Sequence, residues 1–307
     1  MLPFGATLAG LWLAGWSPSL ILGFADPRAY AREPGLYMGA VIGRTANRTA
    51  FGTTTLEGSR LSLPINAPPH HSAGGFEGFS TRVWSVEERR SDRVTLRLDS
   101  PDGDQGYPGA VTVRATYAIV APATLCLTFE ATTSRTTLLG LCHHPYFNLG
   151  PGKDVVDHRL QIAAERYLPC DETILPTGEI ASVTGTPFDF RQPRPLDAVL
   201  SPGVRHNNTL VLHTNPVGPL KGVATLSAPG APTLRLATTQ PGLHVYSAYK
   251  LRSAEAERSA RSLAPFAAIC LEAQAWPDSA NRTGFPSLIS RPDEPYFQRT
   301  EYAFSLD

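Results

Sequence analysis

The sequence predicts an all-β protein in which large antiparallel sheets pack face to face as a sandwich. Three observations support this fold class. Apolar and polar residues alternate with a period of two along much of the chain, and helical periodicity is scarce. The 26 glycines and 28 prolines are scattered between the alternating runs, where they act as turn signals. No repeat, low-complexity tract or linker divides the chain, so we expect a single domain over residues 1–307.

The expected strands, turns and helix follow from the local distribution of apolar, polar and turn-forming residues. Apolar or alternating runs predict strands at residues 6–13, 20–24, 94–98, 111–119, 125–129, 234–236 and 264–271. The first two strands are separated by a turn at Ser17 and Pro18, and a further turn is expected at residues 27–32. Residues 253–263 (SAEAERSARSL) form the one stretch that favours a surface helix.

The composition excludes several classes of protein. The 27 basic and 27 acidic side chains cancel, which gives no support for a nucleic-acid binder. Hydrophobic residues make up 42% of the chain, which argues against disorder. The apolar N-terminus lacks a basic region and is interrupted by glycines and a proline, so we predict neither a signal peptide nor a membrane span.

The four cysteines, Cys126, Cys142, Cys170 and Cys270, stand singly in apolar or strand-like surroundings. A chain of this size does not need disulfides, and no CxxC pair is present, so we interpret them as buried thiols. A reducing cytoplasm is the expected compartment.

Three segments place polar residues where a half-buried strand should be apolar. The first contains Arg44, Asn47 and Arg48, whose planar donors suit hydroxyl and ring oxygens, although a solvated strand end fits the pattern equally well. The second contains His143 and His144 within an apolar run. Adjacent residues of a strand point to opposite faces, so at most one histidine can serve a given pocket.

The third segment contains Glu272, which interrupts an apolar strand. Burial raises the pKa of a carboxyl group and can tune it as a general base, whereas a carboxylate at a strand edge would stay in water. We expect no metal, because adjacent histidines lack the usual ligand spacing and no cysteine or carboxylate cluster accompanies them along the chain.

One histidine and one glutamate suffice for mutarotation, the exchange of the α and β anomers of a free sugar. A base removes the proton of the anomeric hydroxyl, an acid protonates the ring oxygen, and the ring opens. Rotation about the C1–C2 bond then exposes the other carbonyl face before the ring closes again. This chemistry needs no cofactor, metal or covalent intermediate.

At these segments the chain resembles the aldose 1-epimerase (galactose mutarotase) family. The resemblance runs from Gly5 to the C-terminus, and seven stretches occur in the family's order. They are residues 43–48 (GRTANR), 63–66 (LPIN), 74–79 (GGFEGF), 102–109 (DGDQGYPG), 144–149 (HPYFNL), 166–191 (RYLPCDETILPTGEIASVTGTPFDFR) and 271–287 (LEAQAWPDSANRTGFPS).

The resemblance implies a galactose-mutarotase-like supersandwich fold and two catalytic residues. His144 would be the general acid at the ring oxygen, and Glu272 the general base at the anomeric hydroxyl. Asn47 and Arg48 match sugar-binding positions of the family, and Tyr146 matches a residue that lines the same pocket. Arg44, by contrast, is expected to be structural.

The chain departs from the family at three sugar contacts. Ala73 stands where the family has a histidine, with His70 and His71 displaced upstream, so His71 is our candidate for that contact. Arg205 replaces a sugar-binding aspartate and His244 replaces a glutamine, and both are candidate binding residues. Family members also carry a strand or two before Gly5, so the N-terminus is expected to be short relative to the family.

These departures leave alternatives open. An arginine in place of a carboxylate suits an anionic sugar that carries a phosphate, sulfonate or carboxylate group. A glycosidase or lyase would need a second well-placed carboxylate, and Asp189 and Asp278 lie in turn-like stretches typical of structural residues. A non-catalytic sugar-binding module is the third alternative. For all of them the expected partner is a small sugar rather than nucleic acid or membrane, and the chain is expected to be a monomer or homodimer.

Overall fold

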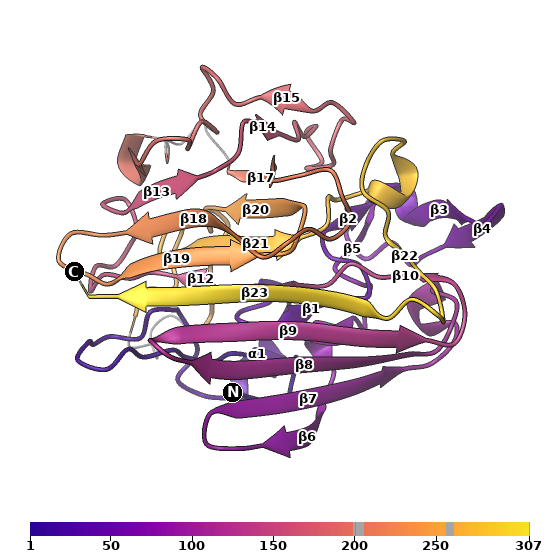
Figure 1. Ribbon diagram of the computed structural model, residues 1–307, viewed down its shortest axis with the longest axis horizontal. Coiled ribbons are helices and arrows are strands. Elements are labelled where there is room, and N and C mark those ends of the chain that lie inside the picture. The colour runs from indigo at the N-terminus through magenta and orange to yellow at the C-terminus, as the bar shows by residue number, and fades with distance from the viewer. Residues whose placement is uncertain (199, 201–205, 256–260, 307) are drawn as a thin grey trace.

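The computed structural model describes residues 1–198, 200, 206–255 and 261–306, and it consists mainly of strands (Figure 1). The strands are β1 (Val41–Ile42), β2 (Arg48–Thr49), β3 (Thr53–Leu56), β4 (Ser59–Ser62), β5 (His71–Ser72), β6 (Ser85–Arg89), β7 (Arg93–Ser100), β8 (Val111–Val120), β9 (Thr124–Thr133), β10 (Thr137–Leu138), β11 (Cys142–His143), β12 (Tyr146–Phe147), β13 (Arg159–Ile162), β14 (Arg166–Tyr167), β15 (Ala181–Ser182), β16 (Arg194–Pro195), β17 (Asn207–Val211), β18 (Lys221–Ser227), β19 (Thr233–Thr238), β20 (Gly242–Tyr246), β21 (Ile269–Gln274), β22 (Ile289–Ser290) and β23 (Tyr296–Ser305).

Helices are short in the described ranges. One α-helical turn, α1 (Ala29–Arg32), lies where the sequence predicts a turn. The 3₁₀ turns are η1 (Pro34–Leu36), η2 (Ala50–Gly52), η3 (Phe79–Thr81), η4 (Asp104–Gly106), η5 (Leu196–Ala198) and η7 (Ser279–Asn281). Among the described helices, none has the length and apolar composition needed to cross a membrane.

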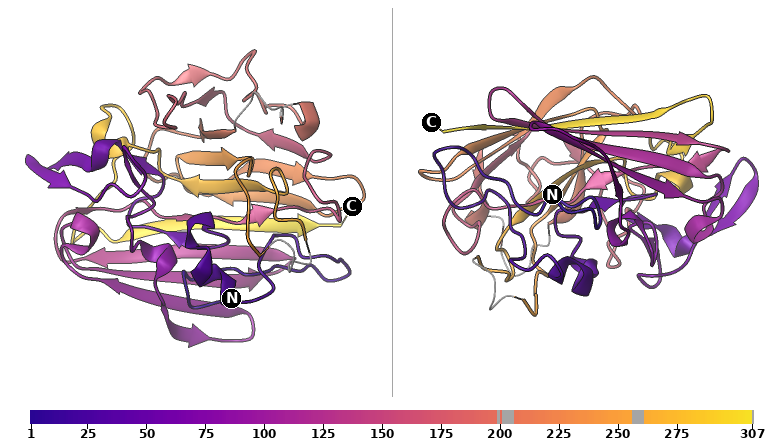
Figure 2. Two further views of the ribbon diagram at one scale, coloured as in Figure 1. Left: turned by 180° about the vertical axis from the view of Figure 1, so that it is seen from behind. Right: turned by 90° about the horizontal axis from the view of Figure 1, so that it is seen from below.

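Two large antiparallel sheets organise the molecule. The nine-stranded sheet has the order β16-β13-β18-β19-β23-β9-β8-β7-β6, and the six-stranded sheet has the order β12-β21-β20-β17-β14-β15. Four two-stranded pairs, β1-β11, β10-β22, β2-β5 and β3-β4, complete the strand pairing. The expected all-β fold with large antiparallel sheets is confirmed, and Figure 2 shows the N-terminal segment (indigo) on the opposite side of the molecule from β23 and β9.

The core lies between the two large sheets because their strands alternate as the sequence predicts. In β8 every second residue from Val111 to Tyr117 is buried. Leu271 of β21 and Leu243 of β20 belong to the same apolar cluster as Val113, so the inner faces of both sheets pack against each other.

The opposite face of the six-stranded sheet carries the polar residues. A strand sends successive side chains to opposite faces, so the even-numbered residues of β20 and β21 point away from the core. Cys270 accordingly belongs to a second apolar cluster, together with Leu22 and Phe24 of the N-terminal segment. This segment covers the outer face of the sheet, and all six residues of β21 are therefore buried.

Two expectations about the N-terminal and C-terminal strands are wrong. Residues 6–13 and 20–24 form isolated bridges, such as Ile21 to Phe147, instead of strands. In the first stretch Ala6 has a positive φ of 47°, which interrupts the extended backbone, and Trp12 is exposed. The strand expected at residues 264–271 begins only at Ile269 and continues past Glu272. The expected helix at residues 253–263 includes residues 256–260, which lie outside the described residues.

Candidate active site

A cavity of about 290 Å³ opens on the outer face of the six-stranded sheet. Its walls come from both this sheet and the N-terminal third of the chain, and most of the lining side chains are polar or aromatic. The lining residues are Gly35, Leu36, Tyr37, Ile42, Asn47, Arg48, Ser72, Ala73, His144, Tyr146, Asn207, His244, Tyr246, Lys250 and Glu272. The predicted residues Asn47, Arg48, His144, Tyr146, His244 and Glu272 therefore come together at one place.

Glu272 lies in the middle of β21, with its side chain on the outer face of the sheet. Its directly opposed residue on β20 is His244. The side chain is 4% exposed, and the Cys142 thiol donates a hydrogen bond to Oε2 over 3.7 Å. Burial raises the pKa of Glu272 to about 8 because it disfavours the charged carboxylate, and the thiol hydrogen bond opposes this rise only in part.

His144 directly follows β11, and its backbone N–H donates to the carbonyl of Ala40. Its ring lies among three tyrosines, with centroid separations of 6.0 Å to Tyr37, 5.0 Å to Tyr146 and 6.2 Å to Tyr246. Burial lowers the pKa of His144 to about 4 because the imidazolium form loses its hydration.

The neighbouring His143 faces the other way. Its ring packs edge-on against Tyr117 and Tyr302, between the two large sheets. The expectation that only one of the two histidines serves the pocket is confirmed.

The two candidate catalytic groups contact each other. His144 Nε2 lies 3.3 Å from Glu272 Oε1 inside the cavity. An imidazole and a carboxyl group at this separation can share a proton, and one can donate a proton while the other accepts one. Among the described residues that line the cavity, Glu272 is the only one with a carboxyl group.

The sheet holds His244 in a fixed orientation beside this pair. Its Nε2 lies 2.7 Å from Asn207 Oδ1 and its Nδ1 lies 3.0 Å from the hydroxyl of Thr209. An amide oxygen can only accept, so Nε2 carries the proton and Nδ1 accepts from Thr209. Burial lowers the pKa of His244 to about 3, and the ring is therefore neutral.

Arg48 and Lys250 are the two cationic residues among the described lining residues. The guanidinium group of Arg48 makes no hydrogen bond or ion pair within the described part of the chain. Burial lowers the pKa of this group. Its donors are therefore available to a ligand. The ammonium group of Lys250 lies over the ring of Tyr249, 5.6 Å from the centroid.

One candidate binding residue, His71, lies elsewhere. His71 is fully buried outside the cavity, where its Nδ1 donates to the carbonyl of Pro64 and its Nε2 accepts from the hydroxyl of Tyr107. Its β5 neighbour Ser72 lines the cavity in its place. Arg205 lies outside the described residues.

Arg44 has the structural role expected for it. Its side chain is buried, and its guanidinium group donates to Ser100 Oγ and to the carbonyls of Ser100, Pro101 and Pro108 at distances from 2.7 to 3.1 Å. These bonds join the loop after β1 to the end of β7 and the loop between β7 and β8.

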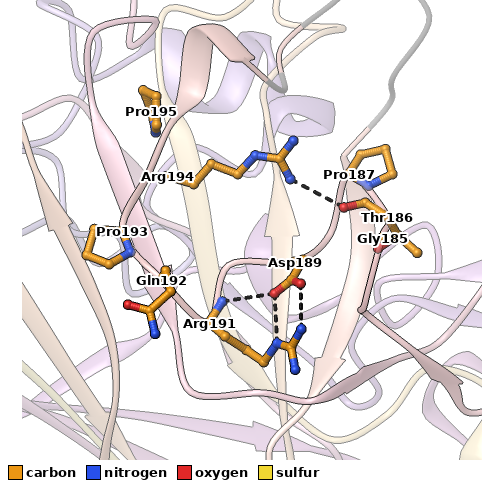
Figure 3. Close-up of a pocket in the computed structure, with 9 residues that line it drawn as sticks. All are labelled: Gly185, Thr186, Pro187, Asp189, Arg191, Gln192, Pro193, Arg194 and Pro195. Carbon is orange, nitrogen blue, oxygen red and sulfur yellow. Dashed lines mark hydrogen bonds and ion pairs between the residues drawn. The ribbon is translucent and has the colours of Figure 1, made fainter.

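A larger open hollow of about 850 Å³ lies at residues 185–195 and contains neither candidate catalytic residue. Figure 3 shows that its arginines are already bonded: Arg191 pairs with Asp189 over 2.7 Å, and Arg194 donates to the carbonyl of Thr186. The smaller cavity with the His144–Glu272 contact is therefore the candidate active site.

Sequence reasoning missed five polar or aromatic lining residues: Tyr37, Ser72, Asn207, Tyr246 and Lys250. Tyr246 follows His244 by two residues on β20, so strand periodicity places both side chains on the same face and could have identified it. Asn207 pairs with Tyr246 in the sheet register. Tyr37 and Lys250 lie in irregular segments without a periodic signal.

Comparisons with known proteins identify the relatives of this chain. The family model described as "Aldose 1-epimerase" matches residues 1–303. Galactose mutarotase from Rattus norvegicus is 37% identical, with 100% of this chain and 90% of that protein covered. Aldose 1-epimerase from Escherichia coli (strain K12) is 32% identical, with 99% and 91% covered.

Solved structures show the same fold. The aldose epimerase homologue from C. elegans superposes with a TM-score of 0.91 at 28% identity, covering 99% of this chain and 94% of that chain. Galactose 1-epimerase from Lactobacillus acidophilus superposes with a TM-score of 0.86 at 29% identity, covering 99% and 89%. The family match over nearly the whole length, together with these relatives, shows that the chain belongs to the aldose 1-epimerase family.

Proposed function

We propose that the cavity binds a free aldose and that His144 and Glu272 open and reclose its ring, which makes the protein an aldose 1-epimerase. The observation that supports this most strongly is the 3.3 Å contact between His144 Nε2 and Glu272 Oε1 in a polar cavity. The two oxygens that exchange protons in mutarotation are bonded to the same carbon of the sugar. An acid and a base that nearly touch can therefore contact both oxygens at once.

The proposed reaction balances without a further reactant. Glu272 takes the proton of the anomeric hydroxyl, whose oxygen forms the C1 carbonyl as the bond from C1 to the ring oxygen breaks. The pKa shifts of the two residues place the single shared proton on Glu272 at rest, so it first passes to His144 Nε2 across the 3.3 Å contact, and His144 then gives it to the ring oxygen. After rotation about C1–C2, the open-chain hydroxyl attacks the other carbonyl face and the two residues exchange protons in reverse.

The protonation of this pair gives a pH prediction. Between about pH 4 and about pH 8 the pair holds one proton, because the pKa of His144 is lowered to about 4 and that of Glu272 is raised to about 8. Below this range the pair gains a second proton and has no acceptor, and above it the pair has no donor. We expect kcat/KM, corrected for solvent catalysis, to be flat within the range and to fall on both sides. A kcat/KM that keeps rising above about pH 8 would contradict the shared proton.

Asn47, Arg48, Tyr146 and His244 are proposed to bind the sugar. Arg48 lines the cavity, and Tyr146 donates its hydroxyl proton to the carbonyl of Leu36, which fixes the tyrosine ring as a wall. His244, held by Asn207 and Thr209, presents a rigid edge beside Glu272.

Arg48→Met tests the binding role. A hydrogen bond from a charged donor contributes about 1.5–3 kcal/mol, so we expect KM for galactose to rise about 10- to 100-fold while kcat changes little. Arg82→Met is the matched control, because Arg82 pairs with Asp104 outside the cavity over 2.6 Å. Steady-state polarimetry on both variants measures the effect, and equal KM values for them would contradict the role of Arg48.

The alternatives to an aldose 1-epimerase are not favoured. A glycosidase needs two carboxyl groups about 5 Å or more apart across the bond, whereas the described cavity lining provides one. Asp278 is bonded to the backbone N–H of Ala50 and to Arg282, and Asp189 is paired with Arg191. The relatives do not favour an anionic sugar, and Arg205, on which that idea rested, lies outside the described residues.

Polarimetry on freshly dissolved sugars tests the proposal directly. The relatives named galactose mutarotase make galactose the first substrate to test, followed by glucose, xylose and arabinose. We expect the approach to anomeric equilibrium to accelerate in proportion to protein concentration. A protein that binds these sugars without accelerating the approach would be a binding module.

Compartment, oligomeric state and domain organisation remain part of the proposal. The described cysteines are all free thiols, in keeping with the cytoplasm. We propose a single-domain monomer or homodimer whose partner is the sugar substrate.

A further inference from the structure

A group of metal-ligand atoms lies at the candidate active site, made of two of its lining residues and a cysteine just outside its lining. His144, Cys270 and Glu272 are all buried, and one ligand atom of each lies within 4.8 Å of the other two. Cys270 and Glu272 are two residues apart on β21, so both side chains point to the outer face of the sheet. No sequence motif marks this group, because His144 lies more than a hundred residues away from Cys270 and Glu272 along the chain.

The separations fit a tetrahedral site. Zinc binds imidazole nitrogen, carboxylate oxygen and thiolate sulfur at about 2.0–2.3 Å, which places tetrahedral ligands about 3.3–3.8 Å from each other. His144 Nε2 already lies 3.3 Å from Glu272 Oε1. Side-chain adjustments of about 1 Å would close the remaining gap to Cys270.

We propose that His144, Cys270 and Glu272 form a binding site for a thiophilic divalent cation such as zinc, and that the bound ion inhibits the enzyme. The inhibition rests on the proposed function, because the ion would occupy the nitrogen and the oxygen that exchange protons with the sugar. The cation site itself rests only on the positions of the three ligands.

The surroundings favour a reversible inhibitory site over a permanent structural one. The thiol of Cys270 makes no hydrogen bond to the described residues, so its sulfur is available to an ion. Ligating histidines usually donate their second ring nitrogen to a partner, which strengthens metal binding. His144 Nδ1 is buried without such a partner among the described residues. A thiol in the ligand group selects zinc or cadmium over magnesium and calcium, which prefer oxygen ligands.

Cobalt(II) titration of the whole chain tests the site without an activity assay. We expect thiolate-to-cobalt charge-transfer absorption and intense tetrahedral bands in the wild type. Both signals should be lost in Cys270→Ala and in Cys270→Val, which keeps more of the side-chain volume. Cys126→Ala is the matched control, because Cys126 is a buried thiol on β9 in the nine-stranded sheet and should leave the signals unchanged.

Zinc inhibition of mutarotation gives the second readout. Wild type and Cys126→Ala should be inhibited alike, and Cys270→Ala should need at least about tenfold more zinc while its metal-free activity is retained. Equal inhibition of all three proteins, or the absence of a cobalt–thiolate spectrum in a folded and active wild type, would overturn the proposal. A normal cobalt spectrum in a protein that exchanges no anomers would instead refute the proposed function and leave the cation site standing.

Discussion

Replacing Glu272 by glutamine is expected to lower kcat for mutarotation by about 10²- to 10⁴-fold, the usual contribution of a positioned general acid or base. Glutamine keeps the size of the side chain, but its amide cannot take the proton of the anomeric hydroxyl. The fold should survive, because burial already disfavours the charged form of this carboxyl group. Exchange rates from NMR, together with the thermal unfolding midpoint, measure both effects.

Asp278→Asn is the matched control for this variant. Asp278 is also a buried carboxylate in the same stretch of chain, but it bonds to Ala50, Asn281 and Arg282 and does not line the cavity. We expect this substitution to lower stability and to leave kcat of the folded protein within a few-fold of wild type. A Glu272→Gln protein that retains comparable activity would remove Glu272 from the mechanism.

Arg44→Met should destabilise the protein by about 3 kcal/mol or more without acting on the chemistry. The change removes the buried donors that satisfy Ser100 Oγ and three backbone carbonyls, and each buried acceptor left without a partner costs about 1–3 kcal/mol. Urea unfolding measures the change in the free energy of unfolding.

Arg135→Met serves as the control for this second substitution. Arg135 forms an exposed ion pair with Asp102 over 3.3 Å, and its removal should change stability by no more than about 0.5 kcal/mol. Equal stability of the two variants would show that the hydrogen bonds of Arg44 contribute little.

The large sheets could be predicted from the sequence because one face of each strand is buried and the other is not. Strands such as β8 and β9 carry this difference in their alternation. The N-terminal segment is apolar as well, but it is buried as an irregular cover over the outer face of the six-stranded sheet. Hydrophobicity alone does not distinguish an irregular buried segment from a strand.

The candidate site was predictable only where polar residues interrupt apolar strands. His144 and Glu272 stand out for that reason, and the family resemblance gave each of them an expected role. Tyr37 and Lys250 enter the cavity from irregular segments, and no local pattern marks them. The expectation that no cysteine or carboxylate cluster accompanies the histidines overlooked neighbours in space, because the strand pairing brings Cys270 and Glu272 beside His144.

NMR exchange spectroscopy on galactose with the wild-type protein tests directly whether the protein interconverts anomers. We expect the exchange rate between the α and β anomer signals to rise in proportion to protein concentration. Methyl galactoside, which lacks a free anomeric hydroxyl, should show no exchange in the same sample. A folded protein that accelerates exchange for none of galactose, glucose, xylose and arabinose would contradict the account.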